Sequence, residues 1–313
     1  MLKGSGGFSS GNPGSASGTG EELQLSDRQY RLWAEMLENK TGVRIASHRD
    51  DFVRRQIVRR VQELGFGDVE DYFREVSQPG RGTREWGVLL DRLLVKESQF
   101  FRHQASHDFF KHRLKCHLQS TSREQRYSVC SVGCSTGEEV YSLAMGAFDS
   151  YRSADQEAAF SIVGIDVSVE AIQAARQGIY TNRHLEAVPG SFLNDYFDAT
   201  TNNTMAVKAE LKRRTGFFVS NMFDENCPGL ASPVDVIFCQ NVLIYLKNWR
   251  RRDLLNSFVD KLKPGGCLIV GPGELNDWQP AGLSRVAYPG IQAFEKLLPK
   301  GISLERDEHE DET

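Results

Sequence analysis

The sequence has few features that would indicate a metal site, a disulfide framework or a membrane span. Its 313 residues include only six cysteines, and none of them falls in a C-x-x-C pair. This spacing argues against zinc knuckles and disulfide scaffolds, so we expect reduced thiols in a cytosolic protein. No apolar run approaches the roughly 20 residues of a membrane span, and the N-terminus lacks the apolar stretch of a signal peptide. We therefore predict a cytoplasmic protein that does not insert into a membrane.

The charge balance excludes another class of partner. The 42 acidic and 38 basic residues give a net charge of −4, so no global positive field draws the chain onto nucleic acid. Residues 1–22 are rich in glycine and serine and predict a disordered leader, while residues 299–313 form an acidic tail. Between these ends we predict a helical N-terminal domain over residues 23–95 and a larger domain over residues 96–298.

The first of these domains contains helical patterns only. Apolar residues recur at helical spacing in "SDRQYRLWAEMLENKTG" and "RDDFVRRQIVRRVQELG", and the first stretch opens on a serine cap and closes on a glycine. Residues 43–64 hold six arginines against three acids. Two readings stay open, a solvated helix face or a docking face for an acidic partner. The arginines in question are Arg54, Arg55, Arg59 and Arg60.

From about residue 125 the pattern changes to short apolar strands that alternate with helices. "YSVCSV", "AFSIVGID", "VDVIFCQN" and "GGCLIVG" read as buried strands. Such alternation is typical of a parallel, doubly wound α/β sheet of Rossmann-like type. Residues 185–220 interrupt it with aromatic, Thr/Asn-rich and basic sequence. We predict an inserted subdomain there.

The turn after the first strand, "VGCSTGEE", resembles a phosphate loop but lacks its main features. A dinucleotide fingerprint beginning at Gly133 would need glycine at the positions of Ser135 and Glu138, and no Gly-Lys-Ser/Thr of a P-loop occurs. Helix N-termini attract phosphate, but Glu138 and Glu139 would repel it. One reading is that these acids only stabilise the helix start. The other is that the ligand here is neutral or cationic.

A second acid specifies the ligand further. Asp166 ends the second strand, about 30 residues after the glycine turn, where an acid typically accepts hydrogen bonds from ribose hydroxyls. An adenosine that carries a positive group and no phosphate fits both acidic positions, as S-adenosylmethionine does. The turn and late strand "LKPGGCLIVG" are frequent in methyltransferases of this architecture. Together, the three motifs predict S-adenosylmethionine as the cofactor.

At this point the sequence resembles a known family. The stretches "FFRH", "CSTGEEVYSLAM", "GIDVSVEAIQAARQGIY", "NDYF", "SNMFD" and "VDVIFCQNVLIYL" are similar to those of the CheR-type chemotaxis receptor glutamate O-methyltransferases, over roughly residues 26–297. The resemblance implies a Rossmann-like class I methyltransferase domain, a small all-helical N-terminal domain and an inserted β-subdomain. It also implies methyl transfer from S-adenosylmethionine to glutamate side chains in the cytoplasmic helical domain of chemoreceptors.

The resemblance also implies roles for individual residues. Arg102 and Tyr245 would be catalytic, with Arg102 facing the reaction centre and Tyr245 lining the pocket near the methyl group. Glu138 would meet the amino-acid end of the cofactor, and Asp166 its ribose. The full set expected to bind the cofactor is Lys96, Ser98, Arg102, Gly133, Glu138, Asp166, Asn221, Met222, Gln240 and Asn241.

Three positions depart from the family pattern. Lys96 stands where the family tends to have asparagine, and Gln240 replaces a frequent arginine. "GPGE" at residues 271–274 replaces a more usual "GHSE". These departures affect the expected substrate subtype more than the expected reaction.

Several alternatives to receptor methylation stay open. The chain could serve flagellar chemotaxis, pilus-based twitching or another chemosensory array. It could instead methylate another protein or a small molecule, or bind S-adenosylmethionine without turnover. A nucleotide-dependent oxidoreductase conflicts with the acidic loop. His103 and His107 have the i, i+4 spacing of metal ligands on a helix, but no third ligand is evident, so we expect no metal. A monomer is the expected state.

Overall fold

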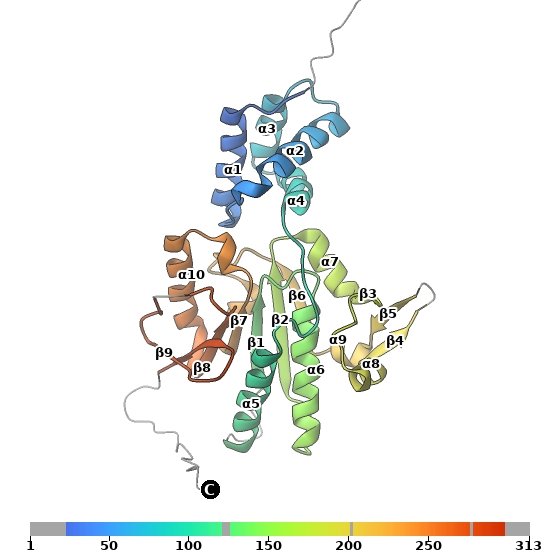
Figure 1. Ribbon diagram of the computed structural model, residues 1–313, viewed down its shortest axis with the longest axis vertical. Helices are drawn as coiled ribbons and strands as arrows, with labels where there is room; N and C mark the ends of the chain where they lie inside the picture. Colours follow the sequence, from blue (N-terminus) through green and yellow to red (C-terminus); the bar gives the residue numbers. More distant parts are fainter. Residues whose placement is uncertain (1–22, 121–125, 201–202, 276–277, 298–313) are drawn as a thin grey trace, which may run out of the picture.

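The computed structural model describes residues 23–120, 126–200, 203–275 and 278–297 of the chain (Figure 1). The expected Gly/Ser-rich leader and acidic tail therefore lie outside the described residues. Within these ranges, no helix has both the length and the apolar character needed to cross a membrane.

The N-terminal part is a cluster of helices: α1 (Asp27–Thr41), α2 (Asp50–Leu64), α3 (Val69–Ser77) and α4 (Arg81–Leu93), with the short turn η1 (Ser47–Arg49) before α2. Ser26 caps α1 in a reciprocal box with Gln29, and Gly42 ends the helix in a left-handed conformation. Apolar stripes from all four helices meet in one core, in which Trp33 stacks on Tyr72. This core is separate from those of the larger domain.

The larger domain is built on a mostly parallel sheet with the strand order β6-β2-β1-β7-β8-β10-β9. Its parallel strands are β1 (Tyr127–Val132), β2 (Phe160–Asp166), β6 (Thr215–Val219), β7 (Val234–Cys239) and β8 (Leu262–Val270). The strands β10 (Gln292–Lys296) and β9 (Leu283–Arg285) close one edge with antiparallel pairing. The strand order reverses between β1 and β7, and ligands of open α/β sheets bind at such a switch point.

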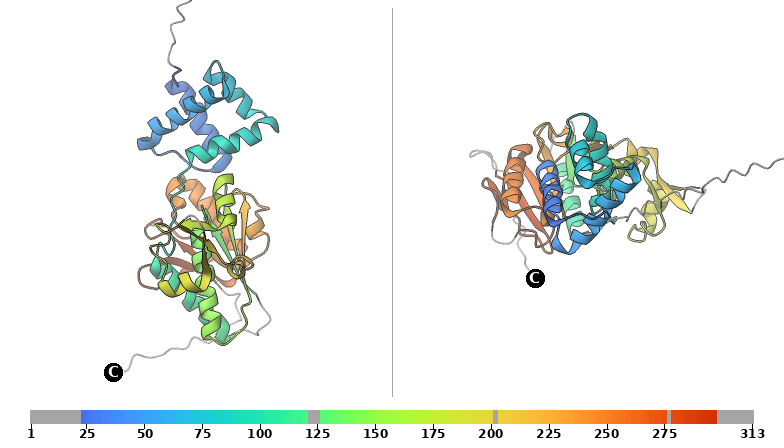
Figure 2. Two further views of the ribbon diagram at one scale, coloured as in Figure 1. Left: turned by 90° about the vertical axis from the view of Figure 1, so that its right-hand side faces the viewer. Right: turned by 90° about the horizontal axis from the view of Figure 1, so that it is seen from above.

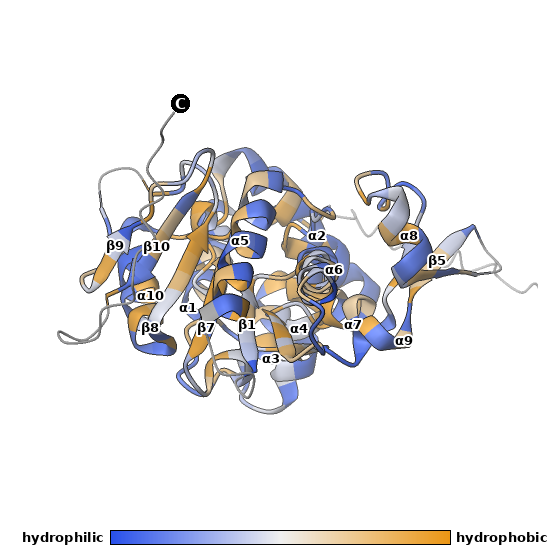
Figure 3. Cartoon of the chain, turned by 90° about the horizontal axis from the view of Figure 1, so that it is seen from below, coloured by the Kyte–Doolittle hydropathy of each residue, from blue (hydrophilic) through white to orange (hydrophobic). Residues whose placement is uncertain are grey.

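Both faces of this sheet are covered. One face packs against α5 (Gln104–Ser120), α6 (Glu138–Ser153) and α7 (Val169–Gln177), and the other against α10 (Asn248–Lys261) and the turn η2 (Pro228–Leu230). Neighbouring strand residues alternate between the two cores, so the strands read as continuous apolar runs. Seen from below, the apolar colouring follows the central strands (Figure 3). No disulfide links the six cysteines, all of which lie in described residues, and Cys116 is the exposed one.

The inserted subdomain differs in extent from the expected residues 185–220. Its antiparallel sheet joins β3 (Ile179–Thr181), β5 (Thr204–Val207) and β4 (Phe197–Ala199), with the short helices α8 (Gly190–Tyr196) and α9 (Ala209–Lys212) beside it. It therefore begins before residue 185. Residues 215–219 form β6 and pair with β2 in the main sheet, because Phe217 packs there against Tyr141.

The helical domain sits over the carboxyl ends of the parallel strands (Figures 1 and 2). The Arg44 backbone N–H donates to the Tyr245 carbonyl at 2.8 Å, and Lys247 forms an ion pair with Glu38 at 2.8 Å. A Cβ at Gly42 would lie 2.2 Å from the Phe223 ring, so only glycine permits this close approach. The two domains thus meet where the sheet presents its loops.

Candidate active site

A cleft with an empty volume of about 1080 Å³ lies at the carboxyl ends of β1, β2 and β7. This is the place where the strand order of the sheet reverses. The cleft brings together most of the residues that the sequence predicts for the site. Those that line it are Ser98, Arg102, Gly133, Asp166, Met222, Gln240, Asn241 and Tyr245.

The glycine turn is shaped by close packing. Gly133 and Gly137 both have positive φ, of 73° and 95°. A Cβ at Gly133 would lie 2.4 Å from Val242, and one at Gly137 would lie 2.8 Å from the Ala175 Cβ. Ser135, between them, also has positive φ, and its buried hydroxyl has no hydrogen-bond partner among the described residues. The turn therefore presents backbone and one unpartnered hydroxyl to the cleft.

The two glutamates that follow this turn have different surroundings, and the cofactor role expected of Glu138 stays a prediction. Its side chain is buried, accepts hydrogen bonds from the Thr136 hydroxyl at 2.7 and 2.9 Å, and does not line the cleft. Glu139 lines the cleft instead and accepts a hydrogen bond from the Ser131 hydroxyl at 2.7 Å. Burial raises the pKa of Glu139 to about 7. Glu139 is thus the carboxylate available to a ligand.

Asp166 connects the glycine turn to the start of α7. One carboxylate oxygen accepts the Ser135 N–H at 2.9 Å, and the other accepts the Ser168 N–H at 2.9 Å. Burial raises the pKa of Asp166, and the two backbone hydrogen bonds oppose this shift. The acid expected from the second strand therefore both lines the cleft and holds its two loops in place.

The loop after β7 is held by a buried glutamate that no sequence motif marks as a site residue. Glu274 accepts the N–H groups of Gly271 at 2.7 Å, Asn241 at 3.2 Å and Ile244 at 3.4 Å. Asn241 has a positive φ of 59°, and its side-chain oxygen lies 3.0 Å from Nε2 of His103. Glu274 thus fixes an uncommon backbone conformation at the edge of the cleft.

Arg102 is the one Arg or Lys among the described residues that line the cleft. It is exposed, and among the described residues it makes one long hydrogen bond, from Nη1 to the Glu97 carbonyl at 3.5 Å. Its guanidinium therefore keeps most of its donors for a ligand. Tyr245 also lines the cleft, from the turn η3 (Leu243–Tyr245).

Two predicted cofactor residues point elsewhere. Lys96 forms an ion pair with Glu170 at the start of α7, so its charge is neutralised outside the cleft. The Asn221 side chain donates to the Lys40 carbonyl at 2.8 Å and joins the two domains. Each side chain thus has a partner from a distant part of the chain, and a cofactor contact for either residue stays a prediction.

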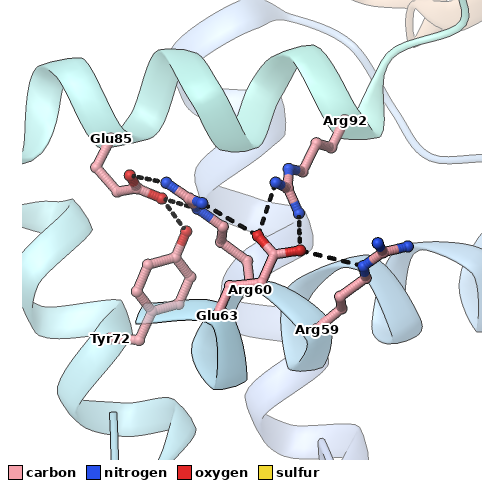
Figure 4. Close-up of polar contacts among 6 residues, drawn as sticks. All are labelled: Arg59, Arg60, Glu63, Tyr72, Glu85 and Arg92. Carbon is pink, nitrogen blue, oxygen red and sulfur yellow. Dashed lines mark hydrogen bonds and ion pairs between the residues drawn. The ribbon is translucent and has the colours of Figure 1, made fainter. Parts of the chain in front are cut away.

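The predicted α2 arginines are mostly paired inside the helical domain (Figure 4). Arg60 donates to both oxygens of Glu85, at 2.7 and 2.8 Å, and Tyr72 donates to the same carboxylate at 2.8 Å. Arg59 pairs with Glu63 at 3.1 Å. Arg54 pairs with Asp27 at 2.7 Å, whereas Arg55 is exposed. A docking role for these four stays a prediction, and their internal pairing favours the reading as a structural helix face.

The helical domain contributes directly to the cleft. Val43, Leu94 and Val95 line it together with the methyltransferase loops. No sequence motif marks these residues, because their position depends on how the two domains dock.

The two histidines have separate environments. His107 is buried, its Nδ1 has no hydrogen-bond partner among the described residues, and burial lowers its pKa to about 3. His103 contacts Asn241. In the part of the chain that the structure describes, no group of three or more His, Cys, Asp or Glu side chains could hold a metal ion.

Together, the doubly wound sheet, the acidic glycine turn and Asp166 at the end of β2 define an S-adenosylmethionine-dependent methyltransferase of the Rossmann-like class. Residues 96–284 match the model of the CheR methyltransferase, SAM binding domain, and residues 28–94 match that of the CheR methyltransferase, all-alpha domain. The chain belongs to the CheR methyltransferase family.

Bacterial relatives support this assignment. The chain is 32% identical to the chemotaxis protein methyltransferase of Escherichia coli over 259 residues, which cover 81% of this chain and 86% of the relative. It is 31% identical to that of Salmonella typhimurium, with the same shares covered. It is also 25% identical, over 88% of its length, to 64% of the probable biofilm formation methyltransferase WspC of Pseudomonas aeruginosa.

The cleft fits the cofactor of this family. Glu139 and Asp166 offer carboxylates to a cationic adenosine ligand, and the unpartnered Ser135 hydroxyl offers a further polar contact. The glycine turn itself contains no Arg or Lys, so it has no positive side chain of its own for a phosphate. The cofactor is S-adenosylmethionine.

Proposed function

We propose that this protein transfers the methyl group of S-adenosylmethionine to glutamate side chains of chemoreceptors and forms glutamyl methyl esters. The observation that carries the proposal is the exposed, sparsely bonded guanidinium of Arg102 in a cleft whose other charged groups are carboxylates. This arrangement suits an anionic acceptor approaching a cationic donor. The relatives named chemotaxis protein methyltransferases support receptors as the acceptors. The relation to WspC extends the range of pathways to other chemosensory arrays.

For the cofactor, we assign binding roles by position and chemistry. Asp166 accepts hydrogen bonds from the ribose hydroxyls, and Glu139 faces the ammonium group of the amino-acid end. Met222 lies at the adenine end, and Gly133 permits close backbone approach. Ser98, Gln240 and Asn241 complete the wall of the cleft.

The acceptor needs no general base. A glutamate side chain has a pKa of about 4.3, so it is an anionic nucleophile at neutral pH. His107, which lines the cleft, is buried and held neutral by a pKa of about 3, because burial disfavours its charged form. No proton therefore has to move between the acceptor and the protein.

Catalysis then depends on orientation. S-adenosylmethionine supplies an electrophilic methyl group on a sulfonium. The acceptor oxygen bonds to the methyl carbon as the carbon–sulfur bond breaks, and the electron pair of that bond stays on sulfur. Arg102 holds the acceptor carboxylate in line, and alignment of this kind lowers barriers by up to several kcal/mol. Tyr245 covers the methyl group from a loop that Glu274 keeps in place.

The test uses radiolabelled S-adenosylmethionine and cytoplasmic fragments of the chemoreceptors from the source organism. The expected product releases labelled methanol in mild base, as a glutamyl ester does. Arg102→Ala is expected to lower kcat about 100-fold, or ~2.7 kcal/mol, and to weaken S-adenosylhomocysteine binding much less. A base-stable product, or equal losses in kcat and product affinity, would contradict the proposal.

A further inference from the structure

The backbone just before Arg102 is held in an uncommon conformation. Phe101 has a positive φ of 51°, which few bulky residues adopt. Its N–H donates to the Ser142 hydroxyl on α6 at 3.0 Å. Its ring packs against those of His107 and Phe192, with centroids 5.2 and 6.0 Å apart. The fold therefore maintains strain at this point, and strained backbone of this kind clusters at functional sites.

The residue just after Arg102 is also held, by a contact that spans 138 positions of the sequence. Nε2 of His103 lies 3.0 Å from the side-chain oxygen of Asn241, in the loop after β7. An amide oxygen can only accept, so Nε2 carries a proton and donates the hydrogen bond. The His103 carbonyl accepts the N–H groups of Ser106 and His107, at 2.9 and 3.3 Å, and so begins α5. His103 thus joins the start of a helix to the loop after β7.

Asn241 is constrained through its backbone and its side chain. Its φ is 59°, its N–H donates to Glu274 at 3.2 Å, and its carboxamide oxygen accepts from His103. Asn241 lines the cofactor cleft, and its carboxamide NH2 group makes no hydrogen bond with the described residues. A carboxamide has one donor end and one acceptor end of nearly equal size, and a half-turn of the side chain exchanges them. The hydrogen bond from His103 therefore favours the orientation that leaves the NH2 group free.

A free amide donor in the same cleft as Arg102 matters because the proposed acceptor is a carboxylate. Arg102 and Asn241 both line the cleft, and His103 adjoins the first in the chain and donates a hydrogen bond to the second. A carboxylate has two oxygens, so two donors can hold it in one orientation. The reversed amide would present its own oxygen to this anion and repel it. The direction of one carboxamide therefore decides whether this part of the cleft attracts the acceptor.

We propose that His103 is a positioning residue for methyl transfer, which orients the Asn241 carboxamide so that Asn241 and Arg102 donate together to the acceptor carboxylate. The proposal rests on the proposed function. His103 acts through Asn241, since its own side chain does not line the cleft. In-line transfer depends on alignment, and a displacement of about 1 Å can cost about 100-fold in rate. The contact between His103 and Asn241 limits such displacement between the two donors.

The first test compares variants in methyl transfer to receptor fragments. We expect His103→Ala to lower kcat about tenfold and to change KM for S-adenosylmethionine less than about twofold, because alignment is lost and cofactor binding is kept. His103→Gln should recover kcat to within about threefold of wild type, since its NH2 group can donate to the same oxygen. His112→Ala, exposed on the same helix, is the control and should change neither constant. Equal losses in His103→Ala and His103→Gln would overturn the proposal.

A double-mutant cycle tests whether His103 acts through Asn241. Asn241→Gly removes the carboxamide, and glycine tolerates the positive φ at this position. In that background, His103→Ala should lower kcat less than about twofold, because the group it orients is already gone. A loss of about tenfold in both backgrounds would overturn the proposal. Wild-type affinity for S-adenosylhomocysteine in the His103 variants shows that they fold.

A third measurement does not depend on turnover. The imidazole nitrogen spectrum, recorded by nuclear magnetic resonance at pH 8, should show wild-type His103 protonated at Nε2 alone, and Asn241→Gly should give a mixture of both tautomers. A mixture in wild type, or no kcat loss in His103→Ala, would overturn the proposal while leaving receptor methylation established by the wild-type enzyme. If the wild-type enzyme methylates no receptor fragment, the proposed function fails and the role of His103 fails with it.

Discussion

The carboxylates of the helical domain and those of the cleft have opposite partners. Burial alone would raise the pKa of Glu85, but hydrogen bonds from Arg60 and Tyr72 bring it below its usual value. Hydrogen bonds from Arg92 and Arg60 lower the pKa of Glu63 to about 2. In the cleft, burial raises the pKa of Glu139 to about 7.

The difference separates charges that serve the fold from charges that serve a ligand. In the helical domain, cation and carboxylate come from the same chain, and their attraction joins helices. Asp166, Glu139 and Glu274 are satisfied by backbone N–H groups and hydroxyls. Burying a carboxylate in this way costs stability, and a cationic ligand offsets that cost. The following experiments test the contrast, from the largest expected effect to the smallest.

The comparison predicts that removing a paired carboxylate of the helical domain lowers the free energy of unfolding. Glu85→Ala leaves the half-buried Arg60 and the buried Tyr72 hydroxyl without their common acceptor. We expect the free energy of unfolding to fall by about 2 kcal/mol, as measured by urea denaturation. The exposed Glu35→Ala is the control, with a change under about 0.5 kcal/mol. An equal loss of S-adenosylhomocysteine affinity in Glu85→Ala would show that the two sets of carboxylates are not independent.

On the cleft side, Asp166→Ala should weaken S-adenosylhomocysteine about tenfold, or ~1.4 kcal/mol, in calorimetric titration. If the contact is to the ribose, 5′-methylthioadenosine, which lacks the amino-acid end, should lose affinity by the same factor. Unequal losses would place Asp166 elsewhere on the ligand. Unchanged binding of both ligands would contradict the proposed position of the adenosine.

Glu139→Gln should weaken the two ligands to different extents, unlike Asp166→Ala. We expect it to weaken S-adenosylhomocysteine about fivefold at pH 8 and 5′-methylthioadenosine less than twofold, since only the first has an ammonium group. Glu138→Gln is the neighbouring control and should leave both unchanged. If Glu138→Gln instead produces the loss, the ammonium contact belongs to Glu138, as the sequence predicts.

The raised pKa of Glu139 predicts a pH dependence as well. Its folded pKa of about 7 exceeds the usual value of 4.5, so the protonated form favours the folded protein, and this contribution is lost as pH rises through 7. Ligand binding has the opposite dependence, because the ammonium group requires the ionised form. Since the neutral form binds about fivefold more weakly, affinity for S-adenosylhomocysteine should fall about threefold from pH 8 to pH 6 in wild type. A slope of the same size in Glu139→Gln would assign it to another group.

The smallest effect is expected where a cleft carboxylate acts only through the backbone. Glu274→Gln should lower kcat about threefold, because the amide offers fewer acceptor sites to the N–H groups that fix the Asn241 loop. Affinity for S-adenosylhomocysteine should change less than kcat. The matched exposed substitution Glu210→Gln should change neither.

Local patterns were enough to predict the helical domain and the parallel sheet, and they selected Asp166, which lines the cleft. Local patterns could not decide whether Glu138 or Glu139 faces the cleft. Adjacent helix residues differ by about 100° in direction, so one residue in the start of α6 decides which acid faces the cleft. The insertion was misplaced for a related reason, because β6 is short and its partner β2 lies about 50 residues earlier.

No sequence pattern indicates the partners of Lys96 and Asn221. Glu170 and the Lys40 carbonyl come from other segments, and only docking of the domains brings them into contact. Glu274 could not be predicted either, because its role depends on accepting three backbone hydrogen bonds across a loop. Side-chain identity predicts chemistry well, but the direction in which a side chain points depends on tertiary contacts.

Because Val43, Leu94 and Val95 form part of the cofactor cleft, the two domains share one ligand. The helical domain cannot unfold without opening that wall, so bound ligand couples the two unfolding transitions into one. At a concentration one hundred times its Kd, a ligand that binds only the folded state raises the free energy of unfolding by about 2.7 kcal/mol. Here the ligand stabilises both domains against unfolding, and the cofactor makes the chain a single cooperative unit.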